Sequence, residues 1–132
     1  MGELKHGTRR VKVLIVEDSD FVRERLVAMI AGVPGVEIVG VARDGCQAQQ
    51  LFQQDRPDAV VLDLQLPGIS GVDLLLEFKR KHPTGVVMVL TTFYFAEVRQ
   101  RCLALGADYC FDKATEFERV LEVLGACKQH DL

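Results

Sequence analysis

The sequence predicts one doubly wound α/β domain, in which five parallel strands form a sheet covered by five helices. The chain has 132 residues, 48% of them hydrophobic, which suits a single domain with its own core. Five short apolar runs alternate with segments whose apolar residues recur at helical spacing. Such alternation implies crossover connections between parallel strands, with helices on both faces of the sheet.

The predicted strands are the five apolar runs, and the helices follow them. The strands cover Val11–Val16, Glu37–Ala42, Ala59–Asp63, Val86–Thr91 and Ala107–Phe111. Helical spacing is seen in four sets: Val22, Leu26 and Met29; Ala48, Leu51 and Phe52; Phe95, Val98, Cys102 and Leu105; Phe117, Leu121 and Leu124. The remaining helix follows the third strand.

Capping residues support these helices. Ser70-x-x-Asp73 and Thr115-x-x-Glu118 have the spacing of capping boxes, which start helices. Gly32 and Gly106 stand where helices should end. We therefore expect helices to begin after Ser70 and Thr115.

Charge and hydropathy exclude several classes of function. The net charge is −3, and residues 1–10 are locally basic, so the rest of the chain is acidic. We expect residues 1–10 to be a flexible extension and residues 11–132 to be the domain. An acidic body is a poor match for a phosphate backbone, so we expect no direct nucleic-acid binding. No run reaches the roughly 20 apolar residues of a membrane span and no secretory signal is seen, so we expect a cytoplasmic protein without membrane contact.

The four cysteines show no metal or disulfide motif. Cys46, Cys102, Cys110 and Cys127 are scattered, without a C-x-x-C pair. We expect small buried thiols rather than a disulfide or a zinc site.

Polar groups follow four of the five predicted strands. Glu17 and Asp18 follow the first, Asp63 ends the third, Thr91 ends the fourth and Lys113 follows the fifth. Each alone has an ordinary explanation, such as a helix cap, a turn or a solvated surface. Because the carboxyl ends of parallel strands meet at one edge, where ligands of such folds bind, we expect these groups to lie together.

The chemistry of that edge indicates a metal ion and a phosphoryl group. Two carboxylates about 4 Å apart repel each other by roughly 4 kcal/mol at an effective dielectric constant of about 20. Three carboxylates therefore need a cation, and hard oxygen ligands without His or Cys favour Mg²⁺. A carboxylate can also act as a nucleophile and form an aspartyl phosphate.

With these residues, the chain resembles a known family, the receiver domain of two-component response regulators (CheY-like). The resemblance rests on VLIVEDSDFVR, VVLDLQLPGISGVDLL, VMVLTT and LGADYCFDK, in that order. It implies a flavodoxin-like sheet of order 2-1-3-4-5. It also implies a function as a phosphoprotein that a sensor histidine kinase or a histidine phosphotransfer protein phosphorylates.

The resemblance assigns roles to the residues at the strand ends. Asp63 would be the phosphoacceptor, and Mg²⁺ would be bound by Asp18, Asp63 and the backbone carbonyl of Gln65, with Glu17 acting through water. Lys113 and Thr91 would contact the phosphoryl oxygens. A haloacid-dehalogenase-type phosphatase is disfavoured because Gln65 stands where its second acid would be, and no P-loop is present. We expect no turnover of an external substrate beyond the chain's own aspartyl phosphorylation and dephosphorylation.

The chain departs from the family at several positions. Thr92 replaces a small residue and would either crowd the phosphate or add a donor. Cys110 stands where the family usually has the aromatic residue of its switch, and Tyr109 and Phe111 flank it. The sequence therefore does not decide whether an aromatic switch operates in this chain. Ala114 replaces a proline and allows a trans peptide bond. Phe93 is expected to shield the aspartyl phosphate from water.

Phosphorylation is expected to alter an interaction face on the last two helices and the last strand. Candidate contacts there are Glu97, Arg99, Arg101 and Asp108, whose alternative explanation is solvated helix charge. We expect a stand-alone regulator; the alternative is the isolated N-terminal receiver of a DNA-binding transcriptional regulator. The sequence leaves the kinase, the target and a phosphorylation-dependent dimer open.

Overall fold

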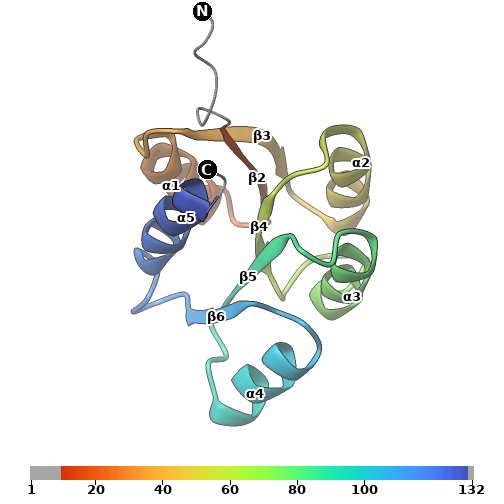
Figure 1. Cartoon of the computed structure of the whole chain (residues 1–132). Coiled ribbons are helices and arrows are strands. Elements are labelled where there is room, and N and C mark those ends of the chain that lie inside the picture. Colours follow the sequence, from red (N-terminus) through yellow and green to blue (C-terminus); the bar gives the residue numbers. More distant parts are fainter. Residues whose placement is uncertain (1–9, 131–132) are drawn as a thin grey trace, which may run out of the picture.

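A computed structural model describes residues 10–130, which form one five-stranded parallel sheet flanked by helices (Figure 1). The strands are β2 (Val11–Val16), β3 (Val36–Ala42), β4 (Ala59–Asp63), β5 (Val86–Thr91) and β6 (Tyr109–Asp112). Their order in the sheet is β3-β2-β4-β5-β6, and every neighbouring pair is parallel. Numbered along the chain, this order is 2-1-3-4-5, as the family resemblance implied. The expected extension lies outside the described residues except for Arg10.

Five helices cover the two faces of the sheet. They are α1 (Asp20–Ala31), α2 (Gly45–Asp55), α3 (Gly71–Lys81), α4 (Ala96–Ala104) and α5 (Arg119–His130). Helices α1 and α5 lie on one face, and α2, α3 and α4 lie on the other (Figure 1). In the described part of the chain, no helix is both long enough and apolar enough to cross a bilayer.

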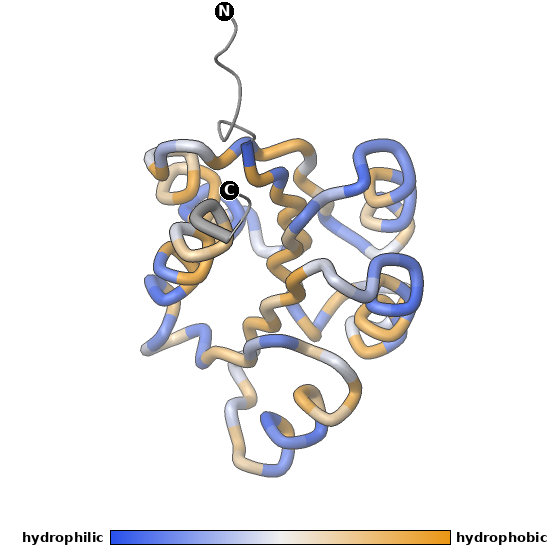
Figure 2. Tube along the Cα trace, in the orientation of Figure 1, coloured by the Kyte–Doolittle hydropathy of each residue, from blue (hydrophilic) through white to orange (hydrophobic). Residues whose placement is uncertain are grey.

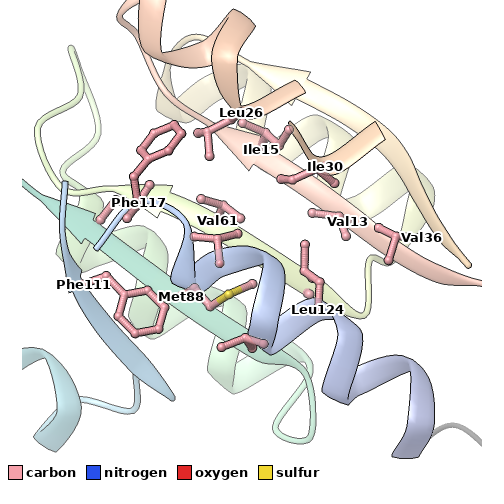
Figure 3. Close-up of a cluster of buried hydrophobic side chains, with 14 of the residues drawn as sticks. Val13, Ile15, Leu26, Ile30, Val36, Val61, Met88, Phe111, Phe117 and Leu124 are labelled. Carbon is pink, nitrogen blue, oxygen red and sulfur yellow. The ribbon is translucent and has the colours of Figure 1, made fainter. Parts of the chain in front are cut away.

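The strands separate two hydrophobic cores. In β2, Val13 and Ile15 face the α1/α5 core (Figure 3), whereas Leu14 and Val16 face the α2/α3 core. Figure 2 shows the same division, with apolar residues along the strands and polar residues on the outer sides of the helices. Strands β2, β4 and β5 are buried on both faces, and such strands read as continuous apolar runs, which is why these three were predictable.

Serine and aspartate side chains start three of the helices. Ser19, Asp44 and Ser70 each accept a hydrogen bond from the backbone N–H three residues ahead. The predicted start at Ser70 is therefore confirmed. Gly32 ends α1 as predicted, and Gly106, with φ of +116°, follows the end of α4. The positive φ at Gly106 is accessible to glycine without strain.

The predicted capping box at Thr115 is wrong. The Thr115 hydroxyl donates to Asp112 Oδ2, and Asp112 Oδ1 accepts from the backbone N–H of Ala114. This aspartate-centred turn takes up the side chain that would have capped a helix. As a result α5 begins only at Arg119.

Two predictions of burial are also corrected. Phe95 was placed on the apolar side of a helix, but it precedes α4 and is 60% exposed. Cys46 is exposed, whereas Cys102 and Cys110 are buried thiols as expected. Both errors concern residues near helix starts, where spacing along the chain does not tell which side chains reach the core. No described peptide bond is cis, which agrees with the expectation for Ala114.

Gly71 packs closely against the backbone of the loop that follows Asp63, at the edge of the sheet that carries the polar groups. It is the first residue of α3, and a Cβ added there would lie 2.6 Å from Leu64 Cα and 2.8 Å from the carbonyl oxygen of Asp63. Both contacts are with backbone, which cannot move aside without displacing the loop after β4. The absence of a side chain at Gly71 therefore sets the path of the chain that follows Asp63.

We predict that Gly71→Ala lowers the free energy of unfolding by about 1–3 kcal/mol, the usual cost of overpacking. Urea denaturation of the purified variant measures this. Gly125→Ala is the matched control, because a Cβ at this α5 position has nothing within 4 Å. It should stabilise the protein by about 0.5–1 kcal/mol through helix propensity. Equal effects of the two substitutions would contradict the steric explanation.

Candidate functional site

The carboxyl edge of the sheet brings together the polar residues that the sequence singled out. Asp63 ends β4, Thr91 ends β5, and Lys113 follows β6. Glu17 and Asp18 follow β2, which is the neighbour of β4 in the sheet. The strand order therefore places these residues along one edge, where loops can converge on a ligand.

Three carboxylates form a cluster at this edge. One oxygen each from Glu17, Asp18 and Asp63 lies within 4.8 Å of the others. Glu17 and Asp63 are 1% and 2% exposed, whereas Asp18 is exposed. Burying two like charges side by side is costly, so the cluster requires compensating positive charge.

Lys113 supplies part of that charge. Its Nζ lies 3.0 Å from Glu17 Oε1 and 3.3 Å from Asp63 Oδ1, forming ion pairs with both buried carboxylates. In residues 10–127, whose side chains are described, Glu17 Oε1 is the one buried side-chain oxygen or nitrogen that accepts no hydrogen bond, although it is paired with Lys113. One ammonium against three carboxylates leaves the site anionic.

The pKa of the Asp63 carboxyl is raised from 3.8 to about 6. Burial is the main cause, and the neighbouring Glu17 carboxylate adds to it. Two contacts act in the opposite direction: Asp63 Oδ1 accepts a hydrogen bond of 3.0 Å from the backbone N–H of Gln65, and Lys113 lies nearby. The net direction shows that burial and like charge outweigh these two contacts.

The donor set fits a hard divalent cation. All three candidate ligands are carboxylate oxygens, and the group contains no histidine or cysteine. The buried Glu17 Oε1 is paired with Lys113 but accepts no hydrogen bond within residues 10–127. An oxygen-only site with excess negative charge matches the preference of Mg²⁺.

Arg23 was missed by sequence reasoning, although it organises the acidic loop. Its guanidinium is buried and donates to the backbone carbonyls of Glu17 (3.1 Å) and Asp18 (3.3 Å). It also pairs with Asp20. Arg23 shares the buried side of α1 with Leu26 and Ile30. An arginine at an apolar position of a helix was the available signal, because a buried guanidinium needs several acceptors.

Thr91 and Thr92 have different surroundings. Thr91 is fully buried, and its hydroxyl oxygen accepts from the backbone N–H of Phe93 at 3.0 Å. Thr92 is exposed, and its hydroxyl donates to Gln65 Oε1 at 3.2 Å. This hydrogen bond links the loop after β5 to the loop after β4, and both alternatives for Thr92, crowding the phosphate or donating to it, stay predictions.

The switch-region candidates lie on opposite sides of β6. Cys110 is buried in the α2/α3 core with Cys102 of α4. Burial raises the pKa of Cys110 to about 11, and the neighbouring Cys102 thiol adds to this rise. The rings of Tyr109 and Phe111 pack together at 5.6 Å between centroids. The aromatic pair therefore lies on the side of β6 away from Cys110.

The four candidate interaction residues are all solvent-exposed. Glu97, Arg99 and Arg101 are exposed on α4, and Asp108 is exposed just before β6. Asp108 also has partners, because its Oδ2 accepts from Lys79 Nζ at 3.0 Å and from the backbone N–H of Val87 at 2.8 Å. Asp108 thus connects α3 with the start of β5, and this structural role accounts for it.

We predict a proton-linked loss of stability at Asp63 in the metal-free protein. The pKa is raised from 3.8 to about 6 in the folded state, so the folded protein binds the proton more tightly than the unfolded chain. Stability is therefore fully present below about pH 4 and is lost as the pH rises through about 6, by about 2 kcal/mol after allowance for solvent screening. Urea denaturation between pH 4 and 8 measures this.

Asp63→Asn is the matched variant for this prediction, because it keeps an acceptor for the Gln65 N–H but has no charge. The variant should be the more stable protein at pH 7, and the difference should vanish near pH 4. Parallel pH profiles for the two proteins would contradict the assigned pKa.

Comparisons with known proteins agree with this geometry. A family model described as the response regulator receiver domain matches residues 13–125. The chain is 39% identical over 100 residues to a protein-glutamate methylesterase/protein-glutamine glutaminase of Pyrococcus abyssi (strain GE5 / Orsay), covering 75% of this chain and 27% of that protein. A Caulobacter vibrioides protein of similar name is 36% identical over 116 residues, 87% of this chain and 34% of its own length. The chain spans about a quarter to a third of these relatives.

Solved structures show the same fold. The response regulator domain of Thermotoga maritima CheB superposes with a TM-score of 0.77 at 26% identity, covering 92% of this chain and 96% of that one. The receiver domain of the Francisella response regulator 1452 superposes with a TM-score of 0.83 at 20% identity, covering 93% and 100%. Since the family model matches most of the chain, the protein belongs to the response regulator receiver domain family of two-component signalling.

Proposed function

We propose that this chain is a phosphorylation-controlled receiver in which Asp63 accepts a phosphoryl group from a phosphohistidine of a sensor kinase or phosphotransfer protein. One observation carries the proposal: a buried aspartate at a strand end lies against Lys113 within an acidic cluster that needs a cation. A buried carboxylate with two like neighbours is costly to keep without a chemical use.

The reaction would take place at the Asp63 carboxylate. One of its oxygens attacks phosphorus, forming an O–P bond while the N–P bond to the donor histidine breaks, and the imidazole takes up a proton. The hydrogen bond from the Gln65 N–H holds Asp63 Oδ1 in a fixed orientation, so the nucleophile is positioned before the donor arrives. Hydrolysis of the aspartyl phosphate by water would return the chain to its starting state.

Mg²⁺ would be held by Asp18, Asp63 and the backbone carbonyl of Gln65, with Glu17 acting through a water molecule. When bound, it supplies positive charge that offsets the carboxylates and the incoming phosphoryl oxygens. The buried Glu17 Oε1, which accepts no hydrogen bond from residues 10–127, supports this assignment. Arg23 would contribute indirectly by fixing the backbone that carries Glu17 and Asp18.

Lys113 and Thr91 would respond to the phosphoryl group. Lys113 Nζ already lies within 3.3 Å of Asp63 Oδ1, close enough for its ammonium to pair with a phosphoryl oxygen. Thr91 would donate its hydroxyl to the phosphoryl group, and the Phe93 N–H bonded to its oxygen would follow this movement. Such a change at the end of β5 would reach the exposed side of α4 and alter what binds there.

A second proposal concerns the protein in which the receiver acts. The relatives named above are called methylesterase and glutaminase, and the chain matches about a quarter to a third of their length. This likeness favours a regulatory role toward an effector of that type over a DNA-binding partner. A stand-alone receiver stays the other candidate. A pull-down with the phosphorylated chain and one with the unphosphorylated chain would show whether methylesterase-type or kinase partners bind each form.

The proposed phosphorylation predicts a mass change. Incubation with a small phosphodonor and Mg²⁺ should add one phosphoryl group to the intact protein, as measured by mass spectrometry. Asp63→Asn should show no gain, and Lys113→Ala should gain it at least about tenfold more slowly, because one charge-assisted contact is worth about 1.5–3 kcal/mol.

A chelator is the control for the metal. It should abolish the gain in the unsubstituted protein, and a gain that survives it would contradict the metal assignment. A phosphoryl group on Asp63→Asn would contradict the assigned acceptor. Isothermal titration with Mg²⁺ separates the two parts, because it reports metal binding whether or not the phosphodonor reacts.

Phe93 is predicted to prolong the life of the aspartyl phosphate. Its ring is 54% exposed and lies two residues beyond Thr91, where it can limit access of water. Phe93→Ala should raise the dephosphorylation rate about threefold, equivalent to about 0.6 kcal/mol of activation free energy. Phe95→Ala, which removes another exposed ring of the same loop, is the control and should leave the rate unchanged. Equal rates in Phe93→Ala and the parent protein would count against shielding.

A further inference from the structure

A cavity of about 630 Å³ lies at the amino edge of the sheet, remote from the acidic site. Its walls include Lys12, Phe52, Arg56, Asp58, Lys81 and His82. Lys12 lies at the start of β2, Asp58 precedes β4, and the other residues come from the last turns of α2 and α3 or follow them. Helices α2 and α3 lie side by side over the same face of the sheet (Figure 1). The cavity is therefore at the opposite end of the strands from Asp63.

The cavity is basic although the protein is acidic. Three permanent cations and a histidine line it against one carboxylate, whereas the whole chain has a net charge of −3. The Asp58 carboxylate is engaged by the backbone N–H of Lys12 at 2.8 Å, and Lys81 pairs with Glu77 at 2.8 Å. Cations near helix C-termini are favoured by the helix dipole, but this effect does not require them to surround a hollow.

The backbone at Arg56 is strained. Its φ of 46° and ψ of 67° are left-handed, and in residues 10–130 no other non-glycine residue has a positive φ. This position ends α2, where glycine or asparagine is the usual choice. An arginine is therefore unusual at this position, and its side chain lines the cavity.

The other walls are held in place by packing. A Cβ added at Gly85 would lie 2.5 Å from His82 Cδ2, so the imidazole of His82 rests directly on the glycine backbone. Phe52 stacks on Phe78 at 4.3 Å between ring centroids and 9° between planes. The cavity thus combines a positioned imidazole, an aromatic wall and three cations, from β2, the end of α2 and the last residue of α3.

We propose that this cavity binds a small organic molecule that carries a phosphate group. The volume lies in the range of about 300–1,000 Å³ typical of small-molecule sites. The planar guanidinium of Arg56 can donate two parallel hydrogen bonds to phosphate oxygens, and Lys12 adds a point charge. Phe52, which is 6% exposed, adds a small apolar surface beside these cations. The proposal is independent of phosphorylation at Asp63, because the two sites occupy opposite edges.

The test uses adenosine monophosphate as the probe, with inorganic phosphate and citrate at equal ionic strength for comparison. A chelator is present throughout, so that metal at the acidic site cannot capture phosphate. Backbone amide NMR shifts locate the binding. We expect the monophosphate to shift the amides of Lys12, Arg56 and His82, and to bind more tightly than either inorganic phosphate or citrate.

Arg56→Gly is the decisive variant. Glycine relieves the left-handed backbone, so the urea midpoint should stay unchanged or rise, whereas the affinity for adenosine monophosphate should fall about tenfold or more. Arg80→Gln is the matched control. Arg80 is an exposed cation in the last turn of α3, next to Lys81, but it does not line the cavity. It should leave the affinity within about twofold of the parent value.

Three results would overturn the proposal. Unshifted amides at millimolar monophosphate would exclude an anion site here. Equal weakening by Arg56→Gly and Arg80→Gln would show diffuse attraction to a basic surface. Binding of citrate or inorganic phosphate as tight as that of the monophosphate would remove the assignment to an organic phosphate.

Discussion

The contact of one lysine with two buried carboxylates is the interaction on which the acidic site depends. Lys113 Nζ lies 3.0 Å from Glu17 and 3.3 Å from Asp63, and both carboxylates are almost fully buried. Removing the lysine would leave both carboxylates buried without compensation, which usually costs several kcal/mol. The three residues come from the ends of three different strands, so the contact exists only when β2, β4 and β6 have taken their places in the sheet.

The sheet makes this contact possible because its strands are parallel and apolar. Four strands carry a polar group at or just after the end, and every neighbouring pair runs in the same direction. Two hydrophobic cores on either face hold the strands in register. The loops that bear the carboxylates are then fixed by local contacts, including the Arg23 guanidinium and the close approach of Gly71 to the backbone after Asp63.

The two edges of the sheet have opposite electrostatic character. The carboxyl edge gathers carboxylates around one lysine, and the amino edge gathers cations around Asp58. Strand β2 connects them, with Lys12 near its start and Glu17 just beyond its end. A chain with a modest net charge of −3 thus separates its charges along the strands, and ligands of different charge would be drawn to different edges.

Much of the fold was readable from the sequence, since a strand buried on both faces must be a short apolar run. The bounds of β2, β4 and β5 agree with the predicted ranges. The start of α5 was wrong because Asp112 draws Thr115 into a turn. The predicted burial of Phe95 was also wrong, because the spacing of apolar residues along the chain does not show which of them lie before the first helical turn.

The candidate site divides in the same way. The sequence by itself determined which residues stand at the strand ends, because residue type and strand length are both local properties. Only the tertiary structure decided that Glu17 Oε1 lacks a hydrogen-bond partner within the described residues, that Arg23 holds the acidic loop, and that Thr92 bonds to Gln65. These facts depend on the distances in space between segments that the fold brings together. Periodicity along the chain carries no information about such distances.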